Sequence, residues 1–192
     1  MKSELPKSAQ VVVLGGGIVG CSVAYHLTKV GISDVVVLER KKLTSGTTWH
    51  AAGLVATSGF TTTTGMEIAR YTRDLYAGLE KDTGFATGFD PVGLLQVAST
   101  QEILEDLRRK ATFGRMVGVE NHEISPGEVA ALWPQARVDD ILAGFLTPAD
   151  GRANPVDVTI SLSKGAAARG VRIVEGVEVI GIEQSGGAVT GV

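Results

Sequence analysis

The N-terminal part of the chain alternates between short apolar runs and an amphipathic stretch, which is the pattern of a β-α-β unit. Val11–Leu14 and Val35–Leu38 are unbroken apolar runs with the length of buried parallel strands. Between them, over Ile18–Val30, the apolar positions take a helical period, and Gly31 follows where a helix would end. The pattern predicts a strand, a helix and a second strand within residues 10–40.

Residues 55–147 mix helical and strand patterns, which predicts an α+β segment inserted into the first domain. After a loop over 55–65, we expect helices over Met66–Asp82 and Thr100–Val117, a short helix ending before Pro134, and strands over Gly93–Ala98, Val119–Ile124 and Ile141–Leu146. Ser125, Pro126 and Glu128 have the spacing of a capping box that begins the short helix. The buried face of the first helix is expected to hold Ile68, Tyr71, Leu75, Tyr76 and Leu79.

The last part of the chain returns to the α/β pattern of its beginning. After the turn-rich stretch Pro148–Asn154, the expected elements are a helix over Pro155–Arg169, strands over Val171–Val174 and Val177–Ile182, a hairpin turn at 185–187 and a strand over Val189–Val192. We therefore expect one discontinuous α/β domain over 1–54 and 148–192. Its parallel strands are fewer than a doubly wound sheet needs, which predicts a fragment of a longer chain.

Gly15, Gly17 and Gly20 follow the first strand in the G-x-G-x-x-G spacing and open the helix. Such glycines permit the tight turn, let a pyrophosphate approach the backbone and let the helix pack closely, while the helix N-terminus attracts phosphate. Glu39 ends the second strand, where its carboxylate would accept hydrogen bonds from ribose hydroxyls and repel a 2′-phosphate. This order predicts a site for FAD or NAD. The alternative is a glycine-rich turn that only packs the helix on the sheet.

Composition narrows the classes of function. The chain has 192 residues, a formal net charge of −3 and 20% charged residues, so there is no basic surplus for nucleic acid. No apolar run approaches the ~20 residues that span a membrane, and the polar residues 1–9 lack a signal-peptide core. Cys21 is the only cysteine, which excludes an internal disulfide and favours a cytoplasmic location. No metal-binding or P-loop motif is present, so neither metal nor nucleoside-triphosphate chemistry is expected.

Two further stretches carry a family resemblance. Leu43–Leu54, L-T-S-G-T-T-W-H-A-A-G-L, and Pro148–Pro155, P-A-D-G-R-A-N-P, resemble the dimethylglycine/sarcosine dehydrogenase family of flavoproteins, which has a D-amino-acid oxidase-like fold. Asn154 stands where that family usually has an acid. The resemblance covers almost the whole chain. It implies that the discontinuous α/β domain is a Rossmann-like FAD-binding domain and that 55–147 is part of a substrate or cap domain.

The same resemblance implies that His50 carries the flavin through the 8α-methyl carbon of the flavin ring. A neutral imidazole nitrogen is nucleophilic near pH 7, which suits that bond; the alternative is an ordinary loop histidine beside Trp49. Small residues around His50 would let the backbone touch a flat ring, and Thr47 and Thr48 would bind the pyrophosphate or ribityl chain. Val179 would offer backbone atoms to the adenine, unless it is a sheet-core valine. The expected cofactor contacts are Gly15, Gly16, Gly17, Ile18, Val19, Gly20, Glu39, Arg40, Ser45, Gly46, Thr47, Thr48, His50, Ala51, Ala52, Gly53, Leu54 and Val179.

The resemblance also implies a reaction, namely oxidation of the N-methyl group of a secondary or tertiary amine by hydride transfer to flavin. An N-methylated amino acid such as dimethylglycine or sarcosine is the implied substrate, and oxygen or an electron-transfer flavoprotein is the implied acceptor. No catalytic base or substrate clamp is identifiable. Asp150 and Arg152 are expected to be turn residues, and Cys21, His26 and His122 to lie outside the site. Two alternatives stay open: an NAD-dependent dehydrogenase, and a non-catalytic regulatory subunit, because the family includes that of pyruvate dehydrogenase phosphatase.

Overall fold

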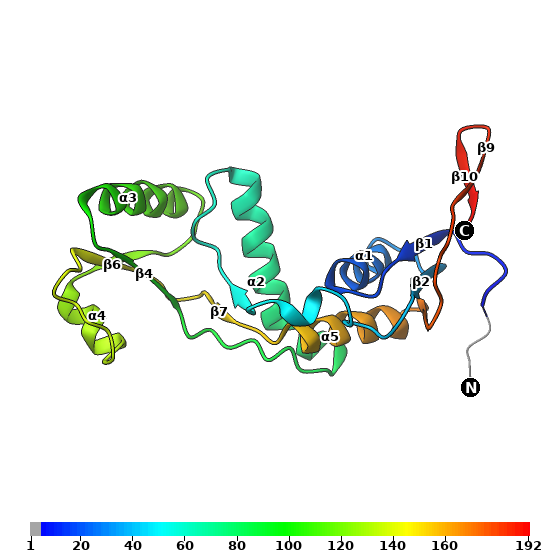
Figure 1. Ribbon diagram of the computed structural model, residues 1–192, viewed down its shortest axis with the longest axis horizontal. Coiled ribbons are helices and arrows are strands. Elements are labelled where there is room, and N and C mark those ends of the chain that lie inside the picture. The colour runs from blue at the N-terminus through cyan, green and yellow to red at the C-terminus, as the bar shows by residue number, and fades with distance from the viewer. Residues whose placement is uncertain (1–4) are drawn as a thin grey trace. The chain divides into compact units, whose positions relative to one another are not determined.

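The computed structural model describes residues 5–192 and divides the chain into two compact units (Figure 1). The first unit comprises Met1–Ala52, Gly78–Gly88 and Asn154–Val192, and the second comprises Gly53–Ala77 and Phe89–Ala153. The fold is α/β, as the sequence predicts. Among residues 5–192, no helix is long and apolar enough to cross a membrane, and no cluster of histidine, cysteine, aspartate or glutamate could hold a metal ion.

The first unit is built on a parallel sheet with the strand order β1-β2-β8. Its strands are β1 (Val11–Leu14), β2 (Val35–Glu39) and β8 (Arg172–Glu175). Val11 pairs with Val35, and Val36 pairs with Arg172. The central strand β2 is buried from Val35 to Leu38, because both neighbours and the layers above and below shield it. The predicted β-α-β unit is confirmed.

Two helices pack against this sheet and against each other: α1 (Ile18–Lys29) and α5 (Pro155–Ala168). Their approach is close, since a Cβ added at Gly165 would lie 2.9 Å from the Tyr25 ring. The buried side of α1 holds the small Cys21 and Ala24 together with Tyr25. The larger apolar residues Val19, Val23 and Val30 are exposed, so the periodicity located the helix but not its buried side.

The other face of the sheet carries an apolar cluster of Val36, Leu38 and Val174. The residues packed against this cluster are Ala9, Val177 and Val179. An open groove of about 760 Å³ runs along this face. The prediction of a strand over Val177–Ile182 is wrong. The alternating side chains of that segment pack on the sheet, but its backbone joins no ladder. The chain then forms a hairpin of β9 (Glu183–Ser185) and β10 (Ala188–Gly191).

Asp82 joins three helices of the first unit. Its carboxylate accepts hydrogen bonds from the Tyr25 hydroxyl and the Lys29 ammonium on α1, and from the Arg169 guanidinium after α5. These donors, Tyr25 first, hold the pKa of Asp82 well below its ordinary range, at about 2. The last turn of α2 (Thr63–Thr83) is thereby fixed to α1 and α5.

Asp82→Asn is expected to remove part of the pH dependence of stability. Because the folded-state pKa of Asp82 lies below its unfolded value, its contribution is present above about pH 4 and is lost as the pH falls toward 2. The carboxylate is 36% exposed, so solvent screening limits the contribution to about 1 kcal/mol. Urea denaturation should separate the variant from the parent at pH 6 and bring them together near pH 2. Asp74→Asn, at a carboxylate paired only with its neighbour Arg73, serves as control, and parallel curves for Asp82→Asn would contradict the prediction.

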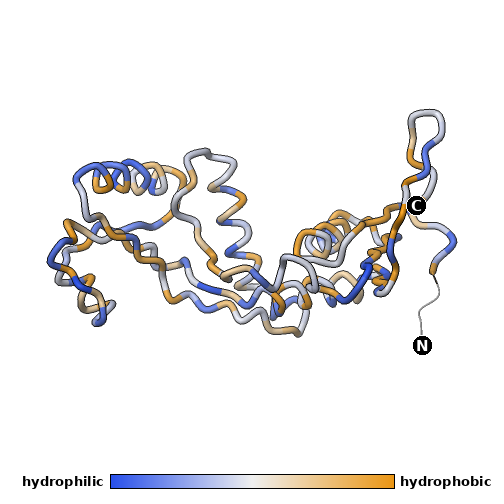
Figure 2. Tube along the Cα trace, in the orientation of Figure 1, coloured by the Kyte–Doolittle hydropathy of each residue, from blue (hydrophilic) through white to orange (hydrophobic). Residues whose placement is uncertain are grey.

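The second unit is built on an antiparallel sheet with the strand order β4-β6-β5. Its strands are β4 (Leu94–Ala98), β5 (His122–Ile124) and β6 (Ala143–Thr147). The helix α3 (Gln101–Met116) packs on it through a core of Ala98, Leu104, Leu107, Ala111, Ala143 and Phe145. The hydrophilic stretches of this helix are blue in Figure 2. The short helix α4 (Pro126–Leu132) begins with the predicted capping box of Ser125 and Glu128.

The long helix α2 differs from its prediction in start and orientation. It begins at Thr63, inside the expected loop, because the Met66 N–H already donates to the Thr62 carbonyl. Ile68 and Tyr71, expected to be buried, are exposed. Leu79 is buried as predicted, but the other buried positions are Met66 and Ala69, because the helix turns Met66 toward Gly114 of α3.

Candidate cofactor-binding site

The glycine turn between β1 and α1 is so tight that side chains are excluded at several positions. Gly15 has a φ of +106°, a left-handed conformation that favours glycine. A Cβ at Gly20 would lie 2.0 Å from the Gly15 carbonyl oxygen, so the turn closes against the helix backbone. A Cβ at Gly16 would lie 2.5 Å from Leu43, and one at Gly17 would lie 3.0 Å from the Thr48 hydroxyl. The turn therefore leaves bare backbone at the helix N-terminus, where a phosphate is attracted.

Glu39 stands at the end of β2 beside this turn. One carboxylate oxygen accepts the Gly16 N–H at 2.7 Å, and the other accepts the Lys41 N–H at 2.8 Å. These two bonds fix the carboxylate at the carboxyl end of the sheet. A carboxylate has about four acceptor positions, so it retains capacity for two ribose hydroxyls.

The segment after Glu39 folds back over the glycine turn and ends in the 3₁₀ turn η1 (Thr48–His50). The Thr44 N–H donates to the Gly16 carbonyl, and the Ile18 N–H donates to the Thr48 hydroxyl at 3.0 Å. Thr48 is buried. The other residues of this loop that the sequence assigns to the cofactor are exposed: Ser45, Gly46, Thr47, His50, Ala51 and Ala52. Small exposed residues leave room for a flat ring to approach the backbone.

His50 lies on this exposed surface next to Trp49, which is 58% exposed. The centres of the two rings are 3.8 Å apart, with an angle of 33° between their planes. The histidine ring is thus accessible, and its stacking on Trp49 restricts its orientation.

Glu175 at the end of β8 is a residue that sequence reasoning missed. Its carboxylate accepts the Leu43 N–H at 2.7 Å and pairs with the Lys42 ammonium at 2.8 Å. The Lys42 ammonium and the Leu43 N–H together hold the pKa of Glu175 below its usual range. Glu175 therefore anchors the loop whose Leu43 side chain covers Gly16. Its position at the carboxyl end of a parallel strand, like that of Glu39, is the signal that could have identified it.

Gly53 and Leu54 belong to the second unit, where β3 (Leu54–Val55) pairs with β7 (Gly151–Arg152). The Ala153 N–H also donates to the Gly53 carbonyl. The turn-rich stretch of the sequence thus contains a short strand that was not predicted. Leu54 is 68% exposed.

Asp150 has a larger structural role than that of a turn residue. It is fully buried, and its carboxylate accepts hydrogen bonds from the backbone N–H of Thr57, at 2.9 Å, and from the Thr57 hydroxyl, at 2.5 Å. Thr57 is fully buried as well. Asp150 therefore holds the segment that follows β3. Its neighbour Arg152 is exposed and pairs with Asp90 at 3.2 Å.

The remaining titratable and nucleophilic candidates are Cys21, His26 and His122, of which Cys21 lies against the glycine turn and donates from its thiol to the Gly16 carbonyl at 3.8 Å. Burial raises the pKa of the Cys21 thiol to about 12, so Cys21 is an inert packing residue. His26 on α1 bonds the Ser22 carbonyl within its own helix. His122 is exposed and pairs with Glu120. Val179, expected to contact adenine, is not on a strand and packs against the Val36 cluster.

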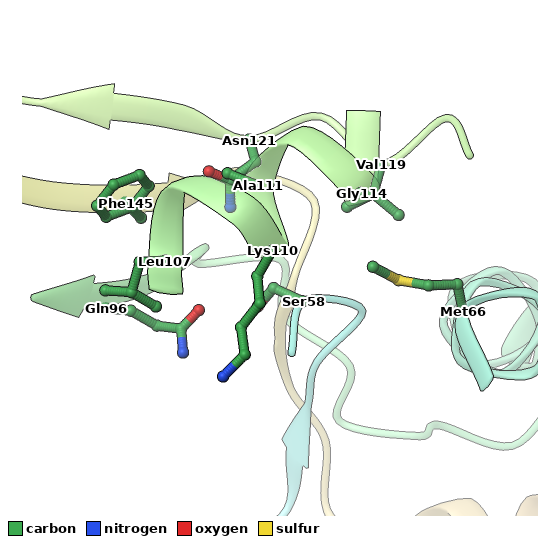
Figure 3. A pocket seen from close by; sticks show the side chains of 10 residues that line it. All are labelled: Ser58, Met66, Gln96, Leu107, Lys110, Ala111, Gly114, Val119, Asn121 and Phe145. Atoms are coloured by element: carbon green, nitrogen blue, oxygen red, sulfur yellow. The ribbon is translucent and has the colours of Figure 1, made fainter. Parts of the chain in front are cut away.

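A small cavity in the second unit lies between α3, the sheet and Met66 of α2 (Figure 3). The polar side chains of Ser58, Gln96, Lys110 and Asn121 line it together with apolar ones. Its volume of about 10 Å³ is that of one water molecule. An amino-acid substrate does not fit there, so this cavity is not a substrate site.

The first unit therefore combines three features of a dinucleotide site. Bare backbone lies at the N-terminus of α1, a fixed carboxylate of Glu39 lies beside it, and a loop of small exposed residues follows. The adenosine and pyrophosphate of FAD fit the first two features, and the flat ring fits the third. The residues present thus suit FAD.

Known proteins agree with this assignment. A family model described as FAD-dependent oxidoreductase matches residues 10–192. The chain is 41% identical to mitochondrial sarcosine dehydrogenase of Homo sapiens, over 93% of the chain and 19% of that protein. It is 40% identical to mitochondrial dimethylglycine dehydrogenase of Rattus norvegicus, over 88% of the chain and 20% of that protein. It is 38% identical to the mitochondrial pyruvate dehydrogenase phosphatase regulatory subunit of Mus musculus, over 98% of the chain and 21% of that protein.

A solved structure supports the fold over nearly the whole chain. The L-proline dehydrogenase from P. horikoshii is 25% identical, with a TM-score of 0.90, and the match covers 96% of this chain and 48% of that one. The chain spans about a fifth of the length of these three curated relatives.

Proposed function

The chain belongs to the FAD-dependent oxidoreductase family, and from this premise we propose that it forms part of a flavoenzyme that oxidises N-methylated amines. The observation that carries the proposal is the glycine turn with Glu39 beside it, followed by an accessible His50 in a loop of small residues. FAD supplies the redox chemistry, and the protein binds and orients it.

The residues of the first unit have separate roles in this proposal. The backbone N–H groups of Gly17 and Val19 bind the pyrophosphate on either side of the Ile18 N–H, which the Thr48 hydroxyl accepts, and Glu39 binds the adenosine ribose. Arg40 lies beside that ribose, and Val179 offers backbone atoms to the adenine. The exposed loop from Ser45 to Ala52 receives the flavin ring.

We further propose that His50 is bonded covalently to the flavin. The bond joins an imidazole nitrogen to the 8α-methyl carbon. Formation of this bond would release one proton from each partner and leave two electrons on the flavin, which dioxygen or another acceptor would remove. Withdrawal of electron density by the imidazole would favour reduction of the ring by an amine.

The proposed substrate is a small N-methylated amino acid, as for the dimethylglycine and sarcosine dehydrogenases that the chain resembles at 40% and 41% identity. FAD held by the glycine turn and Glu39 would supply the redox chemistry, which is acceptance of a hydride equivalent from the N-methyl carbon. Oxygen or an electron-transfer flavoprotein then takes up the electrons.

A second candidate is a non-catalytic regulatory subunit. The 38% identity to the pyruvate dehydrogenase phosphatase regulatory subunit supports it. A protein of that kind would need the fold of the first unit but no covalent flavin, so the state of His50 separates the two candidates. Saturable NADH binding by a protein without flavin would instead favour a nicotinamide-dependent enzyme.

His50→Ala is expected to abolish acid-stable flavin. The purified protein should show a mass excess equal to one FAD that persists in acid, together with a yellow, fluorescent band after denaturing electrophoresis. The variant should lack both, because the imidazole nitrogen is the attachment point. His122→Ala removes an exposed histidine paired with Glu120 and serves as the matched control, which should retain the flavin. Acid-stable flavin in His50→Ala would place the attachment elsewhere, and its absence from the parent protein would favour the regulatory candidate.

A further inference from the structure

The first amide of α1 is capped from outside the helix. The N-cap residue Gly17 has no side chain to accept a hydrogen bond. The N–H groups of the first turn therefore need an acceptor from elsewhere in the chain. The Thr48 hydroxyl supplies it by accepting the Ile18 N–H at 3.0 Å. Thr48 is 8% exposed, so solvent hardly competes for this bond. A Cβ at Gly17 would lie 3.0 Å from that hydroxyl, so glycine also permits the approach of Thr48.

The same threonine is the inner end of the turn that carries His50. Thr48 is the first residue of η1, and it alone is buried among residues 45–52. The His50 N–H donates to the Thr47 carbonyl at 3.1 Å, and the Ala51 N–H donates to the Thr48 carbonyl at 3.2 Å. A single hydrogen-bonded turn therefore separates the fixed hydroxyl from the imidazole.

We propose that Thr48 is a positioning residue, which orients the His50 imidazole toward the cofactor by tying η1 to the N-terminus of α1. The proposal rests on the proposed function, because it concerns a flavin at His50. It differs from the direct contact with the pyrophosphate or the ribityl chain that the sequence predicts for Thr48. A residue that binds the phosphates would affect the affinity for the cofactor, whereas a positioning residue affects formation of the covalent bond between His50 and the flavin.

Two substitutions test this role. Thr48→Val keeps the shape of the side chain but removes the acceptor, and Thr48→Ser restores a hydroxyl. We expect Thr48→Val to lower the acid-stable flavin per chain by roughly fivefold to tenfold, the scale of a lost helix cap. Thr48→Ser should return it to within about twofold of the parent. The affinity for ADP, which probes the phosphate and ribose sites alone, should stay within about threefold in both variants. Unchanged acid-stable flavin in Thr48→Val would overturn the proposal, and so would a parallel loss of ADP affinity.

A measurement without cofactor separates this proposal from the proposed function. Trp49 lies between Thr48 and His50, and replacing the other tryptophan by Trp133→Phe makes it the only one in the chain. The fluorescence anisotropy of Trp49 should fall in Thr48→Val and recover in Thr48→Ser, because the turn is released and then tied again. If the parent carries no acid-stable flavin, the proposed attachment at His50 is wrong. The anisotropy of Trp49 still tests whether Thr48 holds the turn that carries His50. An unchanged anisotropy in Thr48→Val would then overturn the positioning role.

Discussion

Gly20→Ala is expected to lower the free energy of unfolding by about 3 kcal/mol and to weaken ADP binding more than tenfold, one of the two largest effects expected in this chain. The added Cβ would lie 2.0 Å from the Gly15 carbonyl oxygen and 3.1 Å from its carbon. Both are backbone atoms of a turn whose φ of +106° leaves little freedom to move aside. The clash therefore displaces the same backbone that binds the pyrophosphate. Urea denaturation followed by circular dichroism measures the first effect, and ADP titration measures the second.

Gly78→Ala is the matched control for this substitution. Gly78 lies inside α2, and a Cβ there would meet nothing within 4 Å. Alanine is the better helix former, so this variant should gain about 0.5–1 kcal/mol and bind ADP normally. Equal stability of the two variants would show that the turn rearranges freely around Gly20. The close approach of Gly20 to the Gly15 carbonyl would then not affect the free energy of unfolding.

Local chemistry explains why the first unit could be predicted from the sequence. The apolar runs of β1 and β2, and the glycines between them, carry their signal in adjacent residues. The parallel register of Val11 with Val35 follows once the helix between them packs back on the sheet. The capping box at Ser125 is similarly local, since its three hydrogen bonds lie within four consecutive residues.

Contacts between distant residues explain what the sequence could not supply. The Thr48 hydroxyl caps a helix 30 positions away, and Glu175 holds Leu43 across 132 positions. Asp150 holds Thr57 across 93 positions. The residues adjacent in sequence to Thr48, Glu175 and Asp150 do not distinguish them from a surface threonine, glutamate or aspartate. The sequence therefore predicts a loop for the cofactor, but it does not predict which side chains fix that loop.

Periodicity alone also gave a wrong prediction where side chains pack on a sheet but the backbone does not pair with a strand. Val177 and Val179 alternate as a strand would, and both pack on the sheet, yet the segment forms no ladder. In α2, the helical period is correct but the buried side is shifted toward Met66 and away from Ile68. The burial of Met66 depends on its contact with Gly114 of α3, which is distant in sequence and is not visible in the periodicity of α2.

Asp150→Ala is expected to destabilise the chain by about 3 kcal/mol, because it leaves the buried N–H and hydroxyl of Thr57 without their acceptor. Asp150→Asn retains one carbonyl oxygen and should lose less, about 1–2 kcal/mol. Adding Thr57→Val to Asp150→Ala should cause little further loss, since the hydroxyl has already lost its partner. Chemical denaturation of the single and double variants measures this coupling.

Asp90→Asn provides the comparison that assigns the effect to burial rather than to charge. Asp90 is an acid that also lies beside β7, but it is exposed and pairs with Arg152 at 3.2 Å. Loss of such a surface pair should change stability by less than about 1 kcal/mol. If Asp150→Ala were no more destabilising than Asp90→Asn, the Thr57 segment would hold its place without the carboxylate. A larger loss in Asp150→Ala, with strong coupling to Thr57, would instead mean that the buried acid at the P-A-D-G turn fixes the chain directly after β3.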